Sequence, residues 1–189
     1  DNEPAALWVV PLRGGPARRL APRSNSPGFG SVSEVAWSPD GRRIAFTAAT
    51  DPLQTIVGRR PPIGSRAARS SALPAPTARR IMRADWRWDG EGHRDHRTHL
   101  FVIEPASAEP PRQLTRGDWD VTGITWHPGG RTVAFVADRA SDADVEPRPA
   151  VWAVDVDAGP RSRRSVPRPV LVAAGGASRP AYSPDGRWI

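Results

Sequence analysis

The chain has 189 residues and a net charge of +7, from 20 acidic and 27 basic side chains, all of the latter arginine. It contains no cysteine, which excludes disulfides, thiolate metal sites and cysteine nucleophiles. Its 22 prolines are about twice the usual share and argue against a helical bundle, because each internal proline breaks a helix. There is no apolar run of membrane-spanning length and no visible signal peptide, so we expect a cytoplasmic protein that does not enter a membrane.

Short apolar runs recur along the chain in three similar copies. The first copy has runs at 7–10, 19–20, 35–37 and 44–46; the second at 100–103, 113–115, 124–126 and 133–135; the third at 151–154, 170–172 and 180–182. Turn residues separate the runs. Such short runs suit strands better than helices, so the pattern predicts an all-β protein.

One turn appears in each copy, and its residues suit a tight hairpin. In Ser38-Pro39-Asp40-Gly41, proline presets φ at the second position and glycine takes the left-handed position that follows. Residues 183–186 repeat this sequence, while the middle copy has Gly129 where the others have aspartate. The runs at 35–37 and 44–46 are therefore predicted to be antiparallel neighbours.

Four strands in a unit of about 40–50 residues are typical of a β-propeller blade. We therefore interpret residues 1–189 as a partial β-propeller domain of about three four-stranded blades. The chain begins near the third strand of a blade and stops where a second strand should start. We therefore expect a fragment of a longer product or of a decayed gene.

A long insertion separates the first two copies. Between Pro52 and Ala84 there are seven arginines and no acidic residue, and the chain has no aromatic residue between Phe46 and Trp86. The segment is also rich in proline and serine. Residues 52–84 are predicted to be a disordered basic loop.

Several stretches resemble a known family. The decapeptide WSPDGRRIAF at 37–46 resembles the repeat of TolB-like, WD-like propellers. The stretches at 87–95, 99–103, 112–118 and 133–139 follow one another in an order that resembles the N-terminal propeller of prolyl oligopeptidase family serine peptidases. The resemblance is to the acylaminoacyl-peptidase and dipeptidyl-peptidase-like branch of that family.

This resemblance implies a non-catalytic propeller that gates peptide access to a following α/β-hydrolase domain. That domain would supply a Gly-x-Ser-x-Gly elbow, which this chain lacks, so we assign it no catalytic and no cofactor-binding residue. The parent protein would be a serine peptidase acting on peptide substrates. The alternative is a TolB-like protein-binding scaffold without a hydrolase domain.

Three histidines, at 93, 96 and 99, lie near the acidic residues Asp89, Glu91 and Asp95. Imidazoles and carboxylates can bind zinc or manganese, and spacing by three residues would suit one face of a helix. Two glycines precede this segment and a strand follows it, so a polar loop at a blade edge is favoured and no metal site is assigned.

Trp86 and Trp88 flank Arg87 and could stack on single-stranded nucleic acid together with the arginines of the insertion. A propeller also needs large aromatic side chains between its sheets, so nucleic-acid binding is disfavoured. The acidic stretch from Asp138 to Glu146 has no glycine at which a calcium loop could bend, and is predicted to be a solvated loop between strands.

Glu34, Asp120 and Arg179 each precede a predicted inner strand. Any of the three could grip a peptide terminus, and the sequence does not choose among them.

Overall fold

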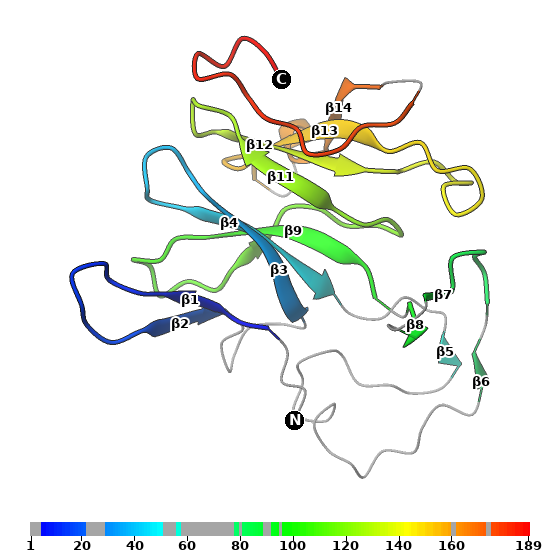
Figure 1. Cartoon of the computed structure of the whole chain (residues 1–189), viewed down its shortest axis with the longest axis horizontal. Helices are drawn as coiled ribbons and strands as arrows, with labels where there is room; N and C mark the ends of the chain where they lie inside the picture. The colour runs from blue at the N-terminus through cyan, green and yellow to red at the C-terminus, as the bar shows by residue number, and fades with distance from the viewer. Residues whose placement is uncertain are drawn as a thin grey trace.

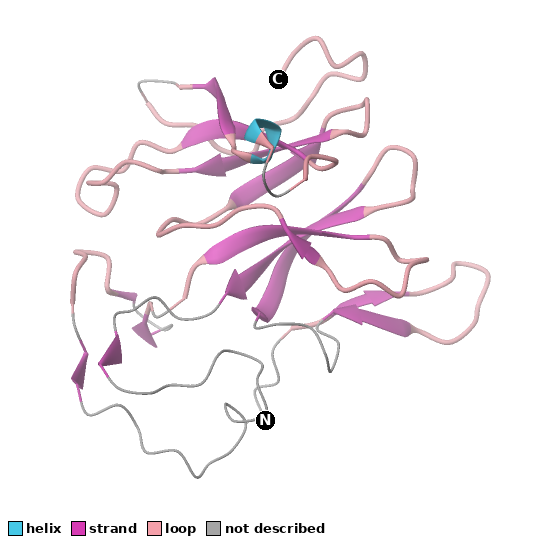
Figure 2. Ribbon diagram, turned by 180° about the vertical axis from the view of Figure 1, so that it is seen from behind, coloured by secondary structure: helices cyan, strands magenta, loops and turns pink. Residues whose placement is uncertain are grey.

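The computed structural model describes residues 5–21, 29–50, 56–57, 78–79, 81–88, 92–94, 96–159, 162–172 and 175–189. Apart from the short 3₁₀ helix η1 (Arg163–Ser165), the regular elements in these ranges are strands (Figures 1 and 2). No helix in the described ranges is long and apolar enough to cross a membrane. The predicted all-β class is confirmed.

Two four-stranded antiparallel sheets form the body of the molecule and stack face to face (Figure 1). The first has the order β10-β9-β4-β3, with strands β3 (Phe29–Trp37), β4 (Ile44–Thr50), β9 (Thr98–Ile103) and β10 (Arg112–Gln113). The second has the order β11-β12-β13-β14, with strands β11 (Thr122–Trp126), β12 (Thr132–Ala137), β13 (Ala150–Asp155) and β14 (Arg168–Leu171). Each sheet is a meander of the kind that forms one propeller blade.

A third, smaller sheet pairs β1 (Leu7–Val9) with β2 (Arg18–Ala21) and lies against the first four-stranded sheet. It corresponds to the third and fourth strands of a blade, as the sequence predicts. Near the other end of the chain, residues 180–182 form no strand, although the repeat predicted one there. The described residues thus form two complete blades and parts of others, consistent with the predicted partial propeller.

The predicted hairpin turns are confirmed. Val35 pairs with Phe46 and Trp37 with Ile44 across the first turn. There the Gly41 N–H donates to the Ser38 carbonyl at 2.9 Å, and Gly41 has φ of 68°. Gly130 and Gly186 repeat this geometry with φ of 69° and 70°. Glycine takes this left-handed conformation without strain, which explains why it recurs in all three copies.

The core is divided into two layers because successive strand residues point to opposite faces. Ile44 and Phe46 pack toward β1 and β2, and Phe46 stacks on Phe101 with ring centroids 5.5 Å apart. Ala45 points the other way, into the layer that contains Val133 and Phe135 of the second sheet. Each central strand therefore contributes to two interfaces at once.

Prolines lie within or directly before the outer strand of each four-stranded sheet. Pro169 lies within β14, opposite Trp152, and Pro110 and Pro111 directly precede the two-residue strand β10. Because proline has no N–H to donate, it is found in strands mainly at sheet edges. These positions match the outer rim of a blade.

The insertion between β4 and β9 contains four short strands: β5 (Ile56–Val57), β6 (Ala78–Arg79), β7 (Arg87–Trp88) and β8 (Gly92–His93). They pair as β5-β6 and β7-β8. Most of the loop that the sequence predicts at 52–84 lies outside the described residues, and its disorder stays a prediction.

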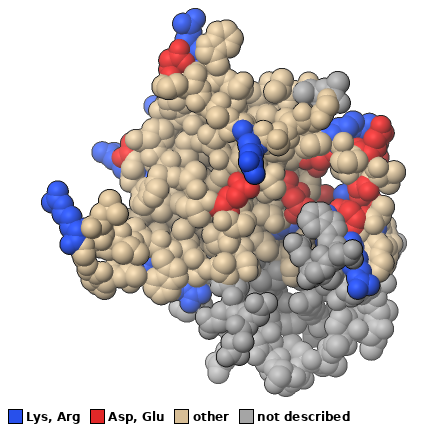
Figure 3. All heavy atoms as spheres, viewed as in Figure 1, with Lys and Arg blue, Asp and Glu red and all other residues tan. Residues whose placement is uncertain are grey.

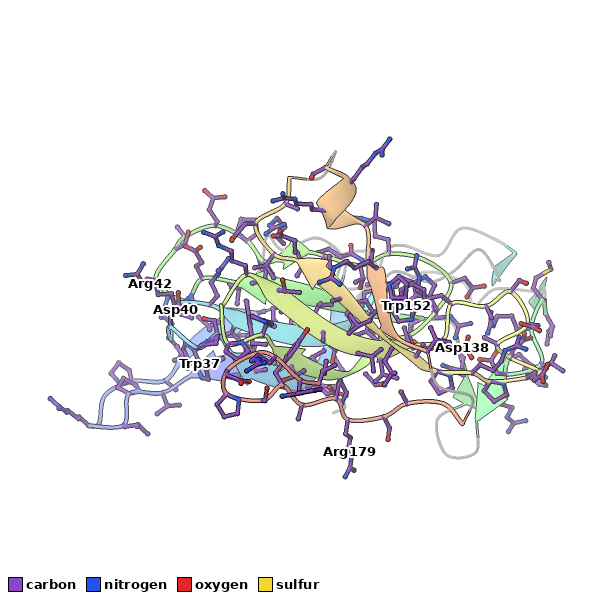
Figure 4. All side chains as sticks on the ribbon, turned by 90° about the horizontal axis from the view of Figure 1, so that it is seen from above. Trp37, Asp40, Arg42, Asp138, Trp152 and Arg179 are labelled. Atoms are coloured by element: carbon purple, nitrogen blue, oxygen red, sulfur yellow. The ribbon has the colours of Figure 1, made fainter. Side chains whose placement is uncertain are left out.

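The two sheets have two distinct ends. The turn end carries the hairpin turns 38–43 and 127–131 and the connection 104–111, and the loop end carries the connections 114–121 and 138–149. In Figure 4, Trp37, Asp40 and Arg42 lie toward the turn end, and Asp138 and Trp152 toward the loop end.

Candidate functional site

The predicted histidine cluster lies only partly within the described residues. His99 is a buried residue of β9, not a loop residue as the sequence suggested. Its Nε2 lies 3.0 Å from the Gly117 carbonyl and its Nδ1 lies 3.2 Å from the Thr115 hydroxyl. Burial lowers the pKa of His99, so the neutral ring fits this position.

Most other members of that cluster lie outside the described residues. His93 belongs to β8, and its side chain lies outside the described residues, as do Asp89, Glu91 and Asp95. His96 is half-buried in the connection that leads to β9. The described residues contain no group of three potential metal ligands.

A network of arginines and aspartates occupies the loop end instead. The Arg97 side chain is 2% exposed; its Nε lies 2.8 Å from Asp118, and one of its terminal nitrogens lies 3.1 Å from Asp120. Arg94 also reaches Asp120, at 2.5 Å. The other oxygen of Asp120 accepts the Thr98 N–H. These contacts join β9 to the connection 114–121.

Arg83 extends the network to the second sheet. Its guanidinium lies 2.9 Å from Asp85 and 4.0 Å from Asp144, in the connection 138–149. Arg83 is the last arginine of the basic loop predicted at 52–84, and its charge is paired with that of Asp85. Burial opposes ionisation of Asp85, but the hydrogen bond and charge of Arg83 and the charges of Arg94 and Arg97 outweigh it and lower its pKa. Figure 3 shows arginine and acidic side chains interleaved over this end.

The acidic stretch that follows β12 is a loop between strands, as predicted, and the structure adds that its carboxylates are ion-paired. Asp138 accepts the Ala140 N–H, and Arg148 lies 2.5 Å from Asp142 and 3.2 Å from Glu146. These carboxylates are therefore occupied by hydrogen bonds and by Arg148.

The three residues proposed to grip a peptide terminus have different roles. Both carboxylate oxygens of Glu34 accept N–H groups of the next inner strand, Gly123 at 2.9 Å and Ile124 at 3.0 Å. Asp120 belongs to the arginine network of the loop end. Arg179 is exposed and points away from the sheets (Figure 4). Glu34 thus joins the two four-stranded sheets, and Asp120 joins β9 to the connection 114–121.

An aromatic cluster that the sequence did not reveal lies beside the network. The Arg139 guanidinium lies 5.0 Å from the ring centroid of Trp119 and 4.4 Å from that of Trp152. Trp119 stacks on Phe135 with centroids 6.1 Å apart. Trp86 is partly exposed, whereas the side chain of Trp88 lies outside the described residues. The cluster packs between sheets, as expected for propeller aromatics.

The turn end contains a groove of about 690 Å³ between the two four-stranded sheets. Apolar residues at the ends of the central strands form its floor, and prolines of the connection 104–111 form one wall: Val102, Ile103, Val156, Pro110 and Pro111. Two arginines and three carboxylates also line it: Arg43, Arg112, Glu104, Glu109 and Asp157. Its volume falls within the ~300–1,000 Å³ of typical ligand clefts.

The arginines of the groove are engaged by the protein itself. Arg43 lies 2.5 Å from Asp157, donates to the Gly130 carbonyl at 2.7 Å and covers the Trp126 ring at 5.5 Å. The guanidinium of Arg112 donates to the Val156 carbonyl. Both guanidiniums therefore join the two sheets across the base of the groove.

The glutamates of the groove are free within the described structure. Glu104 and Glu109 are exposed, and neither carboxylate forms an ion pair or hydrogen bond with another described residue. No sequence motif marked this groove, because it forms between connections about 50 residues apart. The signal in the sequence is the proline-rich connection 104–111 with its two glutamates.

Comparison with known proteins supports the fold. No protein-family model matches the sequence, and no curated protein matches it either. A solved structure of a protein provisionally designated TolB, from Agrobacterium tumefaciens, matches with a TM-score of 0.51 and 19% sequence identity. The match covers 96% of this chain and 43% of that one. The chain thus has a TolB-like β-propeller fold and spans less than half the length of this structural relative.

Proposed function

We propose that the chain is part of a protein-binding β-propeller scaffold, which holds an extended segment of a partner protein in the groove at the turn end. The groove itself is the observation that carries the proposal. It has an apolar floor and a charged rim, which is how peptide-sized clefts combine affinity with orientation. The charges at the loop end, by contrast, are mostly occupied by one another.

The proposal is tested by filling the groove. Gly159 lines it, and a Cβ at this position would meet nothing within 4 Å, so Gly159→Phe should place a ring in the groove without disturbing the backbone. Gly175 is equally open but lies in the connection that follows β14, so Gly175→Phe is the matched control. Binding of a library of labelled octapeptides to the 189-residue chain would be measured by fluorescence anisotropy.

We expect some library members to bind the wild-type chain and Gly175→Phe equally, and Gly159→Phe at least tenfold more weakly. If Gly159→Phe binds the same peptides with unchanged affinity, the groove is not the binding site. If no peptide binds any of the three proteins, the scaffold proposal fails.

The gating role predicted from the resemblance to prolyl oligopeptidase family peptidases stays a prediction. It implies that this chain alone hydrolyses no peptide or ester, since acyl transfer needs a nucleophile held against a base. A serine-directed phosphonate probe should leave the purified chain unlabelled. Stoichiometric labelling would place a nucleophile within these blades and would contradict both the scaffold function and the gating function.

A further inference from the structure

The charge of the groove is opposite in sign to that of the chain. The chain as a whole carries +7, yet the groove is lined by three carboxylates and two arginines. An acidic groove attracts cationic groups and repels acidic ones. The occupant is therefore expected to carry positive charge at the groove.

Within the described part of the chain, the arginines of the groove have partners and the glutamates do not, which makes the groove more negative toward a ligand. Arg43 and Arg112 direct N–H donors to backbone carbonyls, and Arg43 is also neutralised by Asp157. Glu104 and Glu109 have no such partners among the described residues. A ligand that enters the groove therefore meets unpaired negative charge, while the positive charge is already satisfied.

The two glutamates are held in place by their backbone. The Ser107 N–H donates to the Glu104 carbonyl at 3.0 Å, and the Ser107 hydroxyl accepts the Glu109 N–H at 3.0 Å. Pro110 and Pro111 restrict the chain directly after Glu109. Arg18 of β2 donates to the Pro105 carbonyl and fixes the other side of the turn. A rigid turn loses less entropy on binding than a flexible one.

We propose that the groove recognises an extended peptide segment carrying an arginine or lysine, whose cation pairs with Glu104 and Glu109 while its aliphatic stem lies on Val102 and Ile103. This inference rests on the proposed function, since it names the partner chemistry of the same groove. Long basic side chains combine an apolar stem with a charged head, and the groove offers a matching surface to each part.

The test uses three labelled octapeptides that differ at one central residue, which is arginine, glutamine or glutamate. Each is titrated against the wild-type chain, the double variant Glu104→Gln/Glu109→Gln, and the control Glu146→Gln at the loop end. Anisotropy is measured at low and at physiological salt. We expect the arginine peptide to bind about tenfold more tightly than the glutamine peptide, and the glutamate peptide to bind most weakly.

In the double variant the preference for arginine should disappear, and in Glu146→Gln it should remain. If the glutamine peptide binds the wild-type chain as tightly as the arginine peptide, the charge recognition is wrong while the scaffold proposal stands. If the preference survives in the double variant, these glutamates are not its source and the inference is overturned. If none of the peptides binds and the library also yields no binder, the proposed function fails as well.

Discussion

The two ends of the sheets use the same kinds of charged residue in different ways. At the loop end, Arg97 is almost fully buried and lies within ion-pair distance of three aspartates, so the charges hold separate segments of the chain together. At the turn end, Glu104 and Glu109 remain exposed on a rigid turn beside an apolar floor. Paired charge fixes structure, whereas free charge on a fixed frame is available to a ligand. The position of a residue in the fold thus decides its role more than its type does.

Among the substitutions that test this difference between the two ends, the largest loss of stability is expected at Arg97. Arg97→Met leaves Asp118 and Asp120 without this partner in a partly buried site, and we expect a loss of about 2–4 kcal/mol in the free energy of unfolding. The matched change at the turn end, Arg112→Met, removes an arginine that mainly contacts backbone carbonyls, and should cost about 1 kcal/mol. Urea unfolding monitored by tryptophan fluorescence measures both. Equal losses would show that the two ends do not differ in this way.

A smaller effect is expected in the hairpin turn at the turn end. Gly41 has φ of 68°, so Gly41→Val should cost about 1–2 kcal/mol in the free energy of unfolding, although a Cβ there would meet no other atom. The neighbouring change Arg42→Val should cost less, since Arg42 does not need this conformation. The same unfolding assay compares them, and similar values for the two variants would contradict the strain argument.

The loop end should also make the protein sensitive to mild acid. Because burial lowers the pKa of His99 in the folded protein, the unfolded chain binds more protons near neutral pH. Stability should therefore be fully present above the unfolded histidine pKa of about 6.5 and fall as the pH decreases toward the folded pKa. His99→Gln should remove this slope and His127→Gln, at the turn end, should retain it. The measurement is the unfolding midpoint of each variant between pH 7.5 and pH 5. If His99→Gln keeps the slope, the pH dependence of stability does not originate at His99.

The smallest effect is expected where the charges are free. Glu104→Gln and Glu109→Gln should each change the free energy of unfolding by less than about 0.5 kcal/mol, since neither carboxylate has a described partner to lose. Thermal melts of both variants beside the wild-type protein provide the measurement. A loss as large as that of Arg97→Met would mean that these glutamates are structural and would weaken the case for ligand binding.

The sequence predicted those parts of the fold that depend on nearby residues. Ser38 and Gly41 form their turn within a few positions, so the hairpin and its antiparallel pairing could be derived directly. His99 was misplaced because the polar residues before it suggest a loop, whereas β9 pairs with β4 across the whole insertion. Arg97 and Asp118 likewise meet only after folding. The groove lies between two sheets, and no local pattern records the space left between them.

The prolines at the rim of the blades have a consequence for how the protein behaves in a crowded solution. An outer strand with free N–H and C=O groups can recruit a strand from another molecule and begin aggregation. Pro169 interrupts β14 with a residue that cannot donate, and β10 is too short, after Pro110 and Pro111, to serve as a template. These prolines thus protect the rims from strand addition, and leave the turn end free for association through side chains.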